Sequence, residues 1–314
     1  MKVRVACVMP RTSRGDLEYL NVENALKYVD QASDLGAQLI CFPEGYPGPC
    51  TGPSDFGGKI AGDFLDLLCK KARERRVYIT ASSVEPNPSF QGTFYVSIKL
   101  ISKDGSIVLN YRRVQPDEPP LNYRLYGGRM NIAPGEELPV AKTEIGSIGI
   151  LGCMEIWIPE LSRILMLKGA ELIIAPMNAG GRRHRVRGAY TWDTWYHIAK
   201  ARAAENLLFI IIPVNTYSDS EKGPNGMILS PEETLAKSPE HGIWTADLDF
   251  DRLRWLRNNF GQWEDPSSPQ PQVPEGYATH KVRPGQIRLR RPELYRMLAE
   301  PQPDAFDYFH FKRD

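Results

Sequence analysis

A buried strand that ends at a cysteine is encoded by the stretch Gly149-Ile150-Leu151-Gly152-Cys153-Met154-Glu155-Ile156-Trp157-Ile158-Pro159-Glu160. Its apolar run stops abruptly at a glycine and a cysteine, and a helical pattern begins at the proline. A strand followed by a sharp turn and a helix exposes a side chain at the mouth of a sheet. We therefore predict that Cys153 is a nucleophile presented at the end of a buried strand.

A second apolar strand delivers a carboxylate to the same kind of position. The run 37–42 is followed directly by Pro43-Glu44-Gly45-Tyr46. A thiol and a carboxylate at the ends of two buried strands can act as a nucleophile and its base. The structural alternatives are a cysteine that is only a small buried hydrophobic residue and a glutamate that caps a following turn.

The rest of the chain alternates short apolar runs with longer amphipathic stretches, which indicates a layered α/β domain with its strands in the interior. The loop 112–135 contains prolines and lacks a clear period, and long irregular loops of this kind are often functional. The predicted strands are 3–8, 38–42, 77–83, 93–101, 107–113, 145–153, 172–176, 209–215 and a meander over 226–248; the predicted helices are 21–35, 61–75, 159–168, 192–206 and 251–257.

The composition changes after residue 258. Four prolines crowd together between positions 266 and 274, and the remaining sequence has little apolar periodicity. We therefore expect a domain over 1–257 and an extended arm over 258–314 that packs on a partner subunit.

Charge and composition argue against several other classes of protein. The 314 residues carry a formal net charge of +1, which gives no reason to expect a nucleic-acid or membrane partner. No apolar run approaches the roughly 18 residues that span a bilayer, and the N-terminus lacks the layout of a signal peptide. Five cysteines without a CxxC pair or a Cys/His cluster favour a cytoplasmic protein without disulfides, metal or cofactor.

Taken together, the sequence motifs of this chain resemble those of the carbon–nitrogen hydrolase (nitrilase-like) family over roughly residues 3–257. That family has a glutamate after a strand and a proline, a lysine in a Tyr-Arg-Lys string, and a cysteine after a third strand. Phe42-Pro43-Glu44 matches the first element, and Gly152-Cys153-Met154-Glu155 with Pro159-Glu160 matches the third. Supporting matches lie at 168–173, 201–206, 247–249 and 290–295.

Two charged positions of the family pattern differ in this chain. In Asn110-Tyr111-Arg112-Arg113-Val114-Gln115, Arg113 stands where the family has its lysine. The stretch 126–129, where a second glutamate is expected before Pro134-Gly135, has no carboxylate, and Glu118 is the nearest upstream candidate. An arginine keeps the positive charge and can hold an oxyanion, but it hardly ever gives up a proton.

The resemblance implies a four-layer αββα sandwich that forms homo-oligomers through the face carrying the helix after Cys153. It also implies chemistry at a carbon–nitrogen bond that is not a peptide bond. Cys153 would attack a small linear amide or N-carbamoyl compound, with Glu44 as base and Arg113 as oxyanion partner, and an acyl-thioester would form and be hydrolysed. Nitrile hydrolysis at the same site, and a binding protein of this fold with impaired catalysis, are the alternatives.

Four further residues are expected on the substrate side of the site. Glu155 should position the nucleophile turn by accepting backbone N–H groups, without a role in proton transfer. Trp157 either walls the pocket or packs in the core. The basic loop 180–188 contains Arg182 and Arg183, and one of these guanidinium groups can pair with a substrate carboxylate. Its alternative role is a solvated face or a subunit contact, which is the usual role of a charge run.

Overall fold

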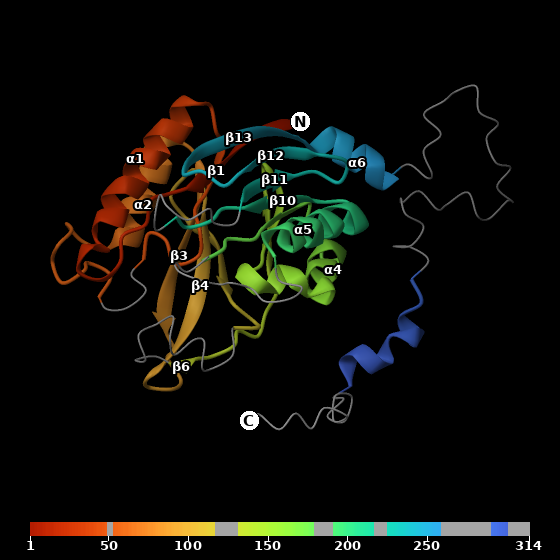
Figure 1. The fold of residues 1–314 in the computed structure, drawn as a ribbon. Coiled ribbons are helices and arrows are strands. Elements are labelled where there is room, and N and C mark those ends of the chain that lie inside the picture. Colours follow the sequence, from red (N-terminus) through yellow and green to blue (C-terminus); the bar gives the residue numbers. More distant parts are fainter. Residues whose placement is uncertain (49–52, 117–130, 179–190, 217–224, 259–289, 301–314) are drawn as a thin grey trace, which may run out of the picture. The chain divides into compact units, whose positions relative to one another are not determined.

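Two β-sheets packed face to face form the centre of residues 1–254 in the computed structural model (Figure 1). The structure describes residues 1–48, 53–116, 131–178, 191–216, 225–258 and 290–300. The chain divides into two compact units, residues 1–254 and 255–314. This division falls inside the helix α6 (Phe250–Asn258), and the predicted domain boundary at residue 257 stays a prediction.

The first sheet has the strand order β13-β1-β2-β3-β4-β5, with β6 beside β4. Its central strands β1, β2 and β3 are parallel, whereas the outer pairs are antiparallel. The strand β13 pairs with β1 along the whole length of β1, so the last strand of the unit forms one edge of this sheet. The bounds are β1 (Lys2–Met9), β2 (Leu39–Cys41), β3 (Tyr78–Pro86), β4 (Thr93–Ile101), β5 (Ile107–Arg112), β6 (Asn131–Ile132) and β13 (Gly242–Asp249).

The second sheet has the strand order β12-β11-β10-β9-β8-β7. Strands β8, β9 and β10 are parallel, and their carboxyl ends therefore lie at one edge of the sheet. The bounds are β7 (Val140–Thr143), β8 (Gly146–Ile150), β9 (Leu172–Ile174), β10 (Phe209–Ile212), β11 (Gly226–Leu229) and β12 (Thr234–Ser238).

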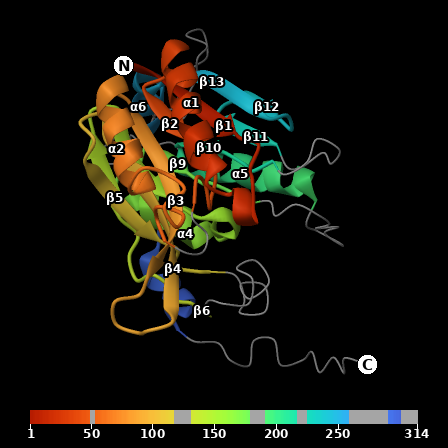
Figure 2. The same ribbon diagram turned by 90° about the vertical axis from the view of Figure 1, so that its left-hand side faces the viewer.

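Helices cover the outer face of each sheet, which confirms the αββα sandwich. In Figures 1 and 2, α1 (Leu20–Asp34) and α2 (Phe64–Arg75) lie on the first sheet, and in Figure 1 α4 (Pro159–Leu167) and α5 (Trp192–Asn206) lie on the other side, beside the second sheet. Four apolar residues of α1, Val22, Ala25, Val29 and Ala32, are buried in one cluster with residues of β1 and β2. They recur at helical spacing, which turns one stripe of the helix toward the sheet.

The two sheets approach each other closely where β1 faces β10 and β11. The Cys7 thiol donates to the carbonyl of Ile212 at 3.3 Å. A Cβ on Gly226 would lie 2.3 Å from the Met9 sulfur, so a side chain larger than glycine does not fit there. The sheets are thus fixed against each other by tight packing between their inner faces.

Two short strands differ from the prediction. The predicted strand 145–153 is shorter and forms a hairpin with β7, because Glu144 and Ile145 make the turn. The predicted loop 112–135 contains β6, which is only two residues long. Strands this short carry too few side chains to show a period.

The second unit is described only in part, by two 3₁₀ turns, η3 (Pro292–Leu294) and η4 (Arg296–Ala299). Within this part Arg291 pairs with Glu293, and Arg290 lies over the ring of Tyr295. The packing of the arm on a partner stays a prediction. Within the described ranges, no helix combines the length and apolar character needed to cross a membrane.

Candidate active site

Three strand ends converge on the candidate site, two from the first sheet and one from the second. Glu44 follows β2, Arg113 follows β5 directly, and Cys153 follows β8. The Arg113 guanidinium reaches the carboxylate of Glu44, and its stem lies against Gly152, the residue before the cysteine. Arg113 therefore lies between the candidate base and the turn that carries the candidate nucleophile.

Arg113 and Glu44 form an ion pair that is almost completely buried. Nη1 of Arg113 lies 3.0 Å from Oε1 of Glu44, and the side chains are 1% and 3% exposed. Nη2 also donates to the carbonyl of Gln115 at 3.3 Å. A guanidinium at this distance stabilises the charged form of the carboxylate. Removing one partner of such a pair typically costs about 3–5 kcal/mol because a buried charge is left behind.

The backbone at Cys153 is held in a left-handed conformation with φ of +50°. Such a conformation is unfavourable for a residue with a side chain by about 1–2 kcal/mol, and it is found at sharp turns that present a functional group. The backbone N–H of Cys153 donates to the carbonyl of Pro176 at 2.9 Å, which anchors the turn to the end of β9. The residue is 9% exposed. The thiol is thus presented by a strained, anchored turn.

Glu155 connects the nucleophile turn to the end of β5. Its Oε2 accepts from the Tyr111 hydroxyl at 2.6 Å and from the Gly152 N–H at 2.5 Å, and its Oε1 accepts from the Gln115 N–H at 2.8 Å. The side chain is fully buried, which raises the pKa of its carboxyl, while Arg113 and the three donors act in the opposite direction. These three bonds tie the nucleophile turn to the end of β5, and the positioning role of Glu155 in catalysis stays a prediction.

Trp157 packs on the helix α5. Its ring is half-buried and meets the ring of Trp195 edge to face, with centroids 5.5 Å apart. Arg202 of α5 donates to the carbonyls of Ile156 and Trp157 at 3.2 and 3.1 Å, and so fixes the far end of the turn. These contacts pack Trp157 on α5, and its place in the wall of a substrate pocket stays a prediction.

Arg182, Arg183 and Glu118 lie outside the described residues. Their expected roles in carboxylate binding and as a second glutamate stay predictions.

Asn215 links the two sheets directly behind Glu44. It follows β10, and its Nδ2 donates to the Glu44 backbone carbonyl at 2.6 Å. Its Oδ1 accepts from the Thr12 hydroxyl at 2.6 Å. The sequence analysis missed this residue, as it missed Tyr111 and Arg202. The available signal was a polar residue at the end of the apolar run 209–214, the same signal that singled out Glu44.

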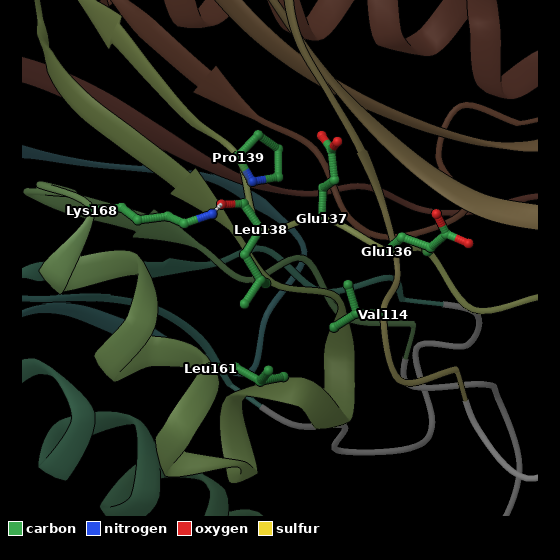
Figure 3. Close-up of a pocket in the computed structure, with 8 residues that line it drawn as sticks. Val114, Glu136, Glu137, Leu138, Pro139, Leu161 and Lys168 are labelled. Atoms are coloured by element: carbon green, nitrogen blue, oxygen red, sulfur yellow. Dashed lines mark hydrogen bonds between the residues drawn. The ribbon is translucent and has the colours of Figure 1, made fainter. Parts of the chain in front are cut away.

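A pocket of about 610 Å³ lies next to the end of β5 and is shown in Figure 3. Val114, Leu138 and Leu161 line its apolar part, and Lys168 closes one side by donating to the Leu138 carbonyl at 2.9 Å. Its lining, as far as the chain is described, does not include Glu44, Arg113 or Cys153. We therefore place the chemistry at the buried ion pair and the cysteine turn and not in this pocket.

Comparison with known proteins places most of the chain in one family. The family model described as carbon-nitrogen hydrolase matches residues 4–258. Nitrilase homolog 2 of Dictyostelium discoideum is 24% identical over 253 residues, which cover 78% of this chain and 75% of that protein. Omega-amidase NIT2-B of Xenopus laevis is 24% identical over 76% of this chain and 86% of its own length. Deaminated glutathione amidase of Synechocystis sp. is 28% identical over 82% of this chain and 96% of its own length.

Solved structures share the fold. A carbon-nitrogen hydrolase of Helicobacter pylori G27 matches with a TM-score of 0.73 and 20% identity, over 96% of this chain and 99% of that chain. An amidase of Nesterenkonia sp. AN1, which carries the acetamide moiety of fluoroacetamide covalently added at its active-site cysteine, matches with a TM-score of 0.62 and 22% identity. That match covers 80% of this chain and 92% of the amidase.

Proposed function

The chain belongs to the carbon–nitrogen hydrolase family, and from this membership we propose that it hydrolyses the carbon–nitrogen bond of a small linear amide or N-carbamoyl compound. One observation carries the proposal. Arg113 is paired with Glu44 in the buried interior, and its stem lies against Gly152, the residue before Cys153, so a carboxylate, a fixed positive charge and the cysteine turn come together at the ends of three strands.

The proposed reaction begins with attack of the Cys153 sulfur on the carbonyl carbon while Glu44 takes the thiol proton. The carbonyl oxygen becomes an oxyanion. When this intermediate collapses, the carbon–nitrogen bond breaks, and Glu44 returns the proton to the leaving nitrogen, which departs as ammonia or an amine. An acyl-thioester remains on the cysteine.

Water then releases the acyl group. Glu44 accepts a proton from the water as its oxygen attacks the thioester carbon, and the carbon–sulfur bond breaks. The thiolate takes the proton back from Glu44, so the enzyme is regenerated and the product is a carboxylic or carbamic acid. In both halves of the reaction one carboxylate carries the proton.

Arg113 contributes charge and not protons in this scheme. Its guanidinium stays protonated and offers fixed donors, which suits it to stabilise a developing oxyanion. In its observed place it also keeps Glu44 oriented toward the turn through the 3.0 Å contact. Glu155, Asn215 and Arg202 hold the three strand ends and act on the reaction only through these groups.

The relatives support an amide over other substrates. Omega-amidase NIT2-B and deaminated glutathione amidase are both amidases by name, and the Nesterenkonia amidase forms a covalent adduct at its cysteine. A binding protein without turnover is the second candidate. It is favoured by Arg113 itself, because a permanently charged guanidinium occupies the candidate base.

Ammonia release tests the proposal. The panel contains small linear amides, monoamides of dicarboxylic acids, N-carbamoyl amino acids and nitriles. Cys153→Ala is the inactive control, and Cys69→Ala, on α2, is the matched control that removes a partly exposed thiol elsewhere. Release that persists in Cys69→Ala and vanishes in Cys153→Ala supports the hydrolase. No release by the folded wild-type protein supports the binding protein, and release that survives in Cys153→Ala rules out Cys153 as the nucleophile.

A further inference from the structure

The backbone of Gly152 does not need to be glycine. Its φ of −94° and ψ of 120° are those of an ordinary extended residue, which any amino acid adopts. The reason for a glycine at this position must therefore lie in its surroundings.

The surroundings of Gly152 are filled by Arg113. A Cβ added at Gly152 would lie 2.6 Å from both Cγ and Cδ of Arg113 and 2.9 Å from Nε. All three contacts are shorter than real Cβ atoms make. They involve the stem of the arginine and not its far end, so a rotation of the guanidinium group alone does not relieve them.

Arg113 has little freedom to move its stem away. Its N–H donates to the Val96 carbonyl at 2.9 Å, and its own carbonyl accepts from Gly135 at 2.7 Å. At the other end the guanidinium is bound by Glu44 and the Gln115 carbonyl. A buried side chain fixed at both ends cannot make room for a methyl group without losing one of these contacts.

We propose that Gly152 is a positioning residue, and that the space left by its missing side chain determines where the Arg113 guanidinium lies. Glycine at 152 and arginine at 113 form a matched pair, in which the glycine admits the arginine stem and the stem places the charge at Glu44. The inference rests on the proposed function for its catalytic consequence, but the pair itself is a property of the folded protein.

A lysine at position 113 should need the space left by Gly152 less than the arginine does. Its stem is flexible at every bond and ends in a single nitrogen, whereas arginine must bring a planar fork into one orientation. A lysine can therefore turn its stem away from a methyl group at 152 and still place a charge near Glu44. Gly152→Ala should consequently lower kcat strongly when residue 113 is arginine and much less when it is lysine.

A double-mutant cycle tests the pair. The variants are Gly152→Ala, Arg113→Lys and the double variant, with Gly149→Ala as the matched control on β8. The three atoms nearest to a Cβ at Gly149 belong to the Leu165 side chain and lie 3.0–3.4 Å away, a looser fit than the 2.6–2.9 Å found at Gly152. Displacing a catalytic group by about 1 Å can cost on the order of 100-fold. We expect Gly152→Ala to lower kcat about 100-fold with KM little changed, and Gly149→Ala to lower kcat by less than about 5-fold.

The second background decides the outcome. In the Arg113→Lys background, Gly152→Ala should lower kcat by less than about 10-fold. The difference from the roughly 100-fold loss beside Arg113 is the coupling expected of two residues in contact. An equal loss in both backgrounds, or a Gly152→Ala variant as active as the wild type, would overturn the proposal.

A stability cycle separates this proposal from the hydrolase proposal. Here Arg113→Ala replaces Arg113→Lys, because it removes Cγ and Cδ altogether. We expect Gly152→Ala to lower the urea midpoint of the wild type clearly and that of Arg113→Ala little. If no substrate is turned over but this coupling is present, the matched pair stands and the hydrolase proposal fails. If the two shifts are equal, the matched pair fails.

Discussion

Nη1 of Arg113 lies 3.0 Å from Oε1 of Glu44, and both side chains are shielded from water almost completely. A buried ion pair seldom stabilises a fold more than apolar side chains of the same volume would. Its presence at the meeting point of three strand ends is therefore better explained by chemistry than by stability. Four variants and one labelling experiment follow from this arrangement.

Arg113→Lys should lower turnover. Lysine keeps the Cγ and Cδ that lie beside Gly152, but it replaces a fixed planar fork with a mobile point charge, so the charge is less well placed. We expect kcat to fall by about 10-fold, and by about 100-fold or more in Arg113→Met, which removes the charge. Steady-state kinetics on the best substrate measure both. A rise in kcat for Arg113→Lys would show that the arginine impairs the natural protein.

Cys153 should be the reactive thiol of the described core. Burial raises the pKa of Cys7 to about 12 and that of Cys41 well above its ordinary value, so these thiols are neither ionised nor accessible at neutral pH. Iodoacetamide followed by peptide mass spectrometry should label Cys153 first and leave Cys7 and Cys41 unlabelled. The experiment uses a Cys50→Ser/Cys69→Ala background, because Cys50 lies outside the described residues and the Cys69 thiol is partly exposed. Faster labelling of Cys7 than of Cys153 in the native protein would contradict the assignment of Cys153 as the nucleophile.

Glu155→Gln should change how stability depends on pH. The pKa of the Glu155 carboxyl is raised in the folded protein, chiefly by burial, so the folded state binds this proton more tightly than the unfolded chain does. The charged carboxyl therefore costs stability at neutral pH, and this cost is relieved as the pH falls through the folded pKa toward the unfolded one. Glutamine does not titrate.

The stability difference between wild type and Glu155→Gln should consequently shift in favour of the wild type as the pH is lowered from 7 to about 4.5. Urea unfolding at several pH values measures it, and titrations elsewhere cancel in the difference. A shift in favour of the variant would mean that Arg113 and the three donors outweigh burial.

Asn215→Ala should loosen Glu44 and lower kcat. The variant removes the 2.6 Å bond to the Glu44 carbonyl and leaves the Thr12 hydroxyl without this acceptor. A loss of about 1–3 kcal/mol in the free energy of unfolding and a fall in kcat are expected. Thr12→Val is the matched control, because it removes the hydroxyl that donates to Asn215 and to the Pro10 carbonyl but keeps the bond from Asn215 to the Glu44 carbonyl. If both variants lower kcat equally, the contact with Glu44 is not the one that matters.

The sequence pattern predicts polar residues that directly follow a strand, but it misses residues whose partners lie on the other sheet. Glu44 and Cys153 each follow an apolar run that stops abruptly, so local pattern alone locates them at the mouth of a sheet. The partner of Glu44 is different. Asn215 is 171 positions away along the chain, and only the packing of one sheet on the other brings its amide to the Glu44 carbonyl.

The same limit applies to Gly152 and Tyr111. A glycine before a cysteine looks like a turn residue, yet its backbone is ordinary and its role depends on the arginine stem beside it. Tyr111 lies in a strand pattern that predicts a buried aromatic side chain, but its hydroxyl partner Glu155 belongs to the other sheet's turn. Contacts between layers have no period in the sequence, so periodicity cannot predict them.

The division of the site between two layers has a consequence for folding. Glu44 and Arg113 come from one sheet and Cys153 from the other, so their spacing measures how far one layer has slid over its neighbour. A partly ordered state with every strand paired but the layers displaced by about 1 Å would keep its far-ultraviolet circular dichroism and lose its turnover. Turnover would then return last on refolding, after the circular dichroism. The catalytic rate would therefore report how well the two sheets are aligned.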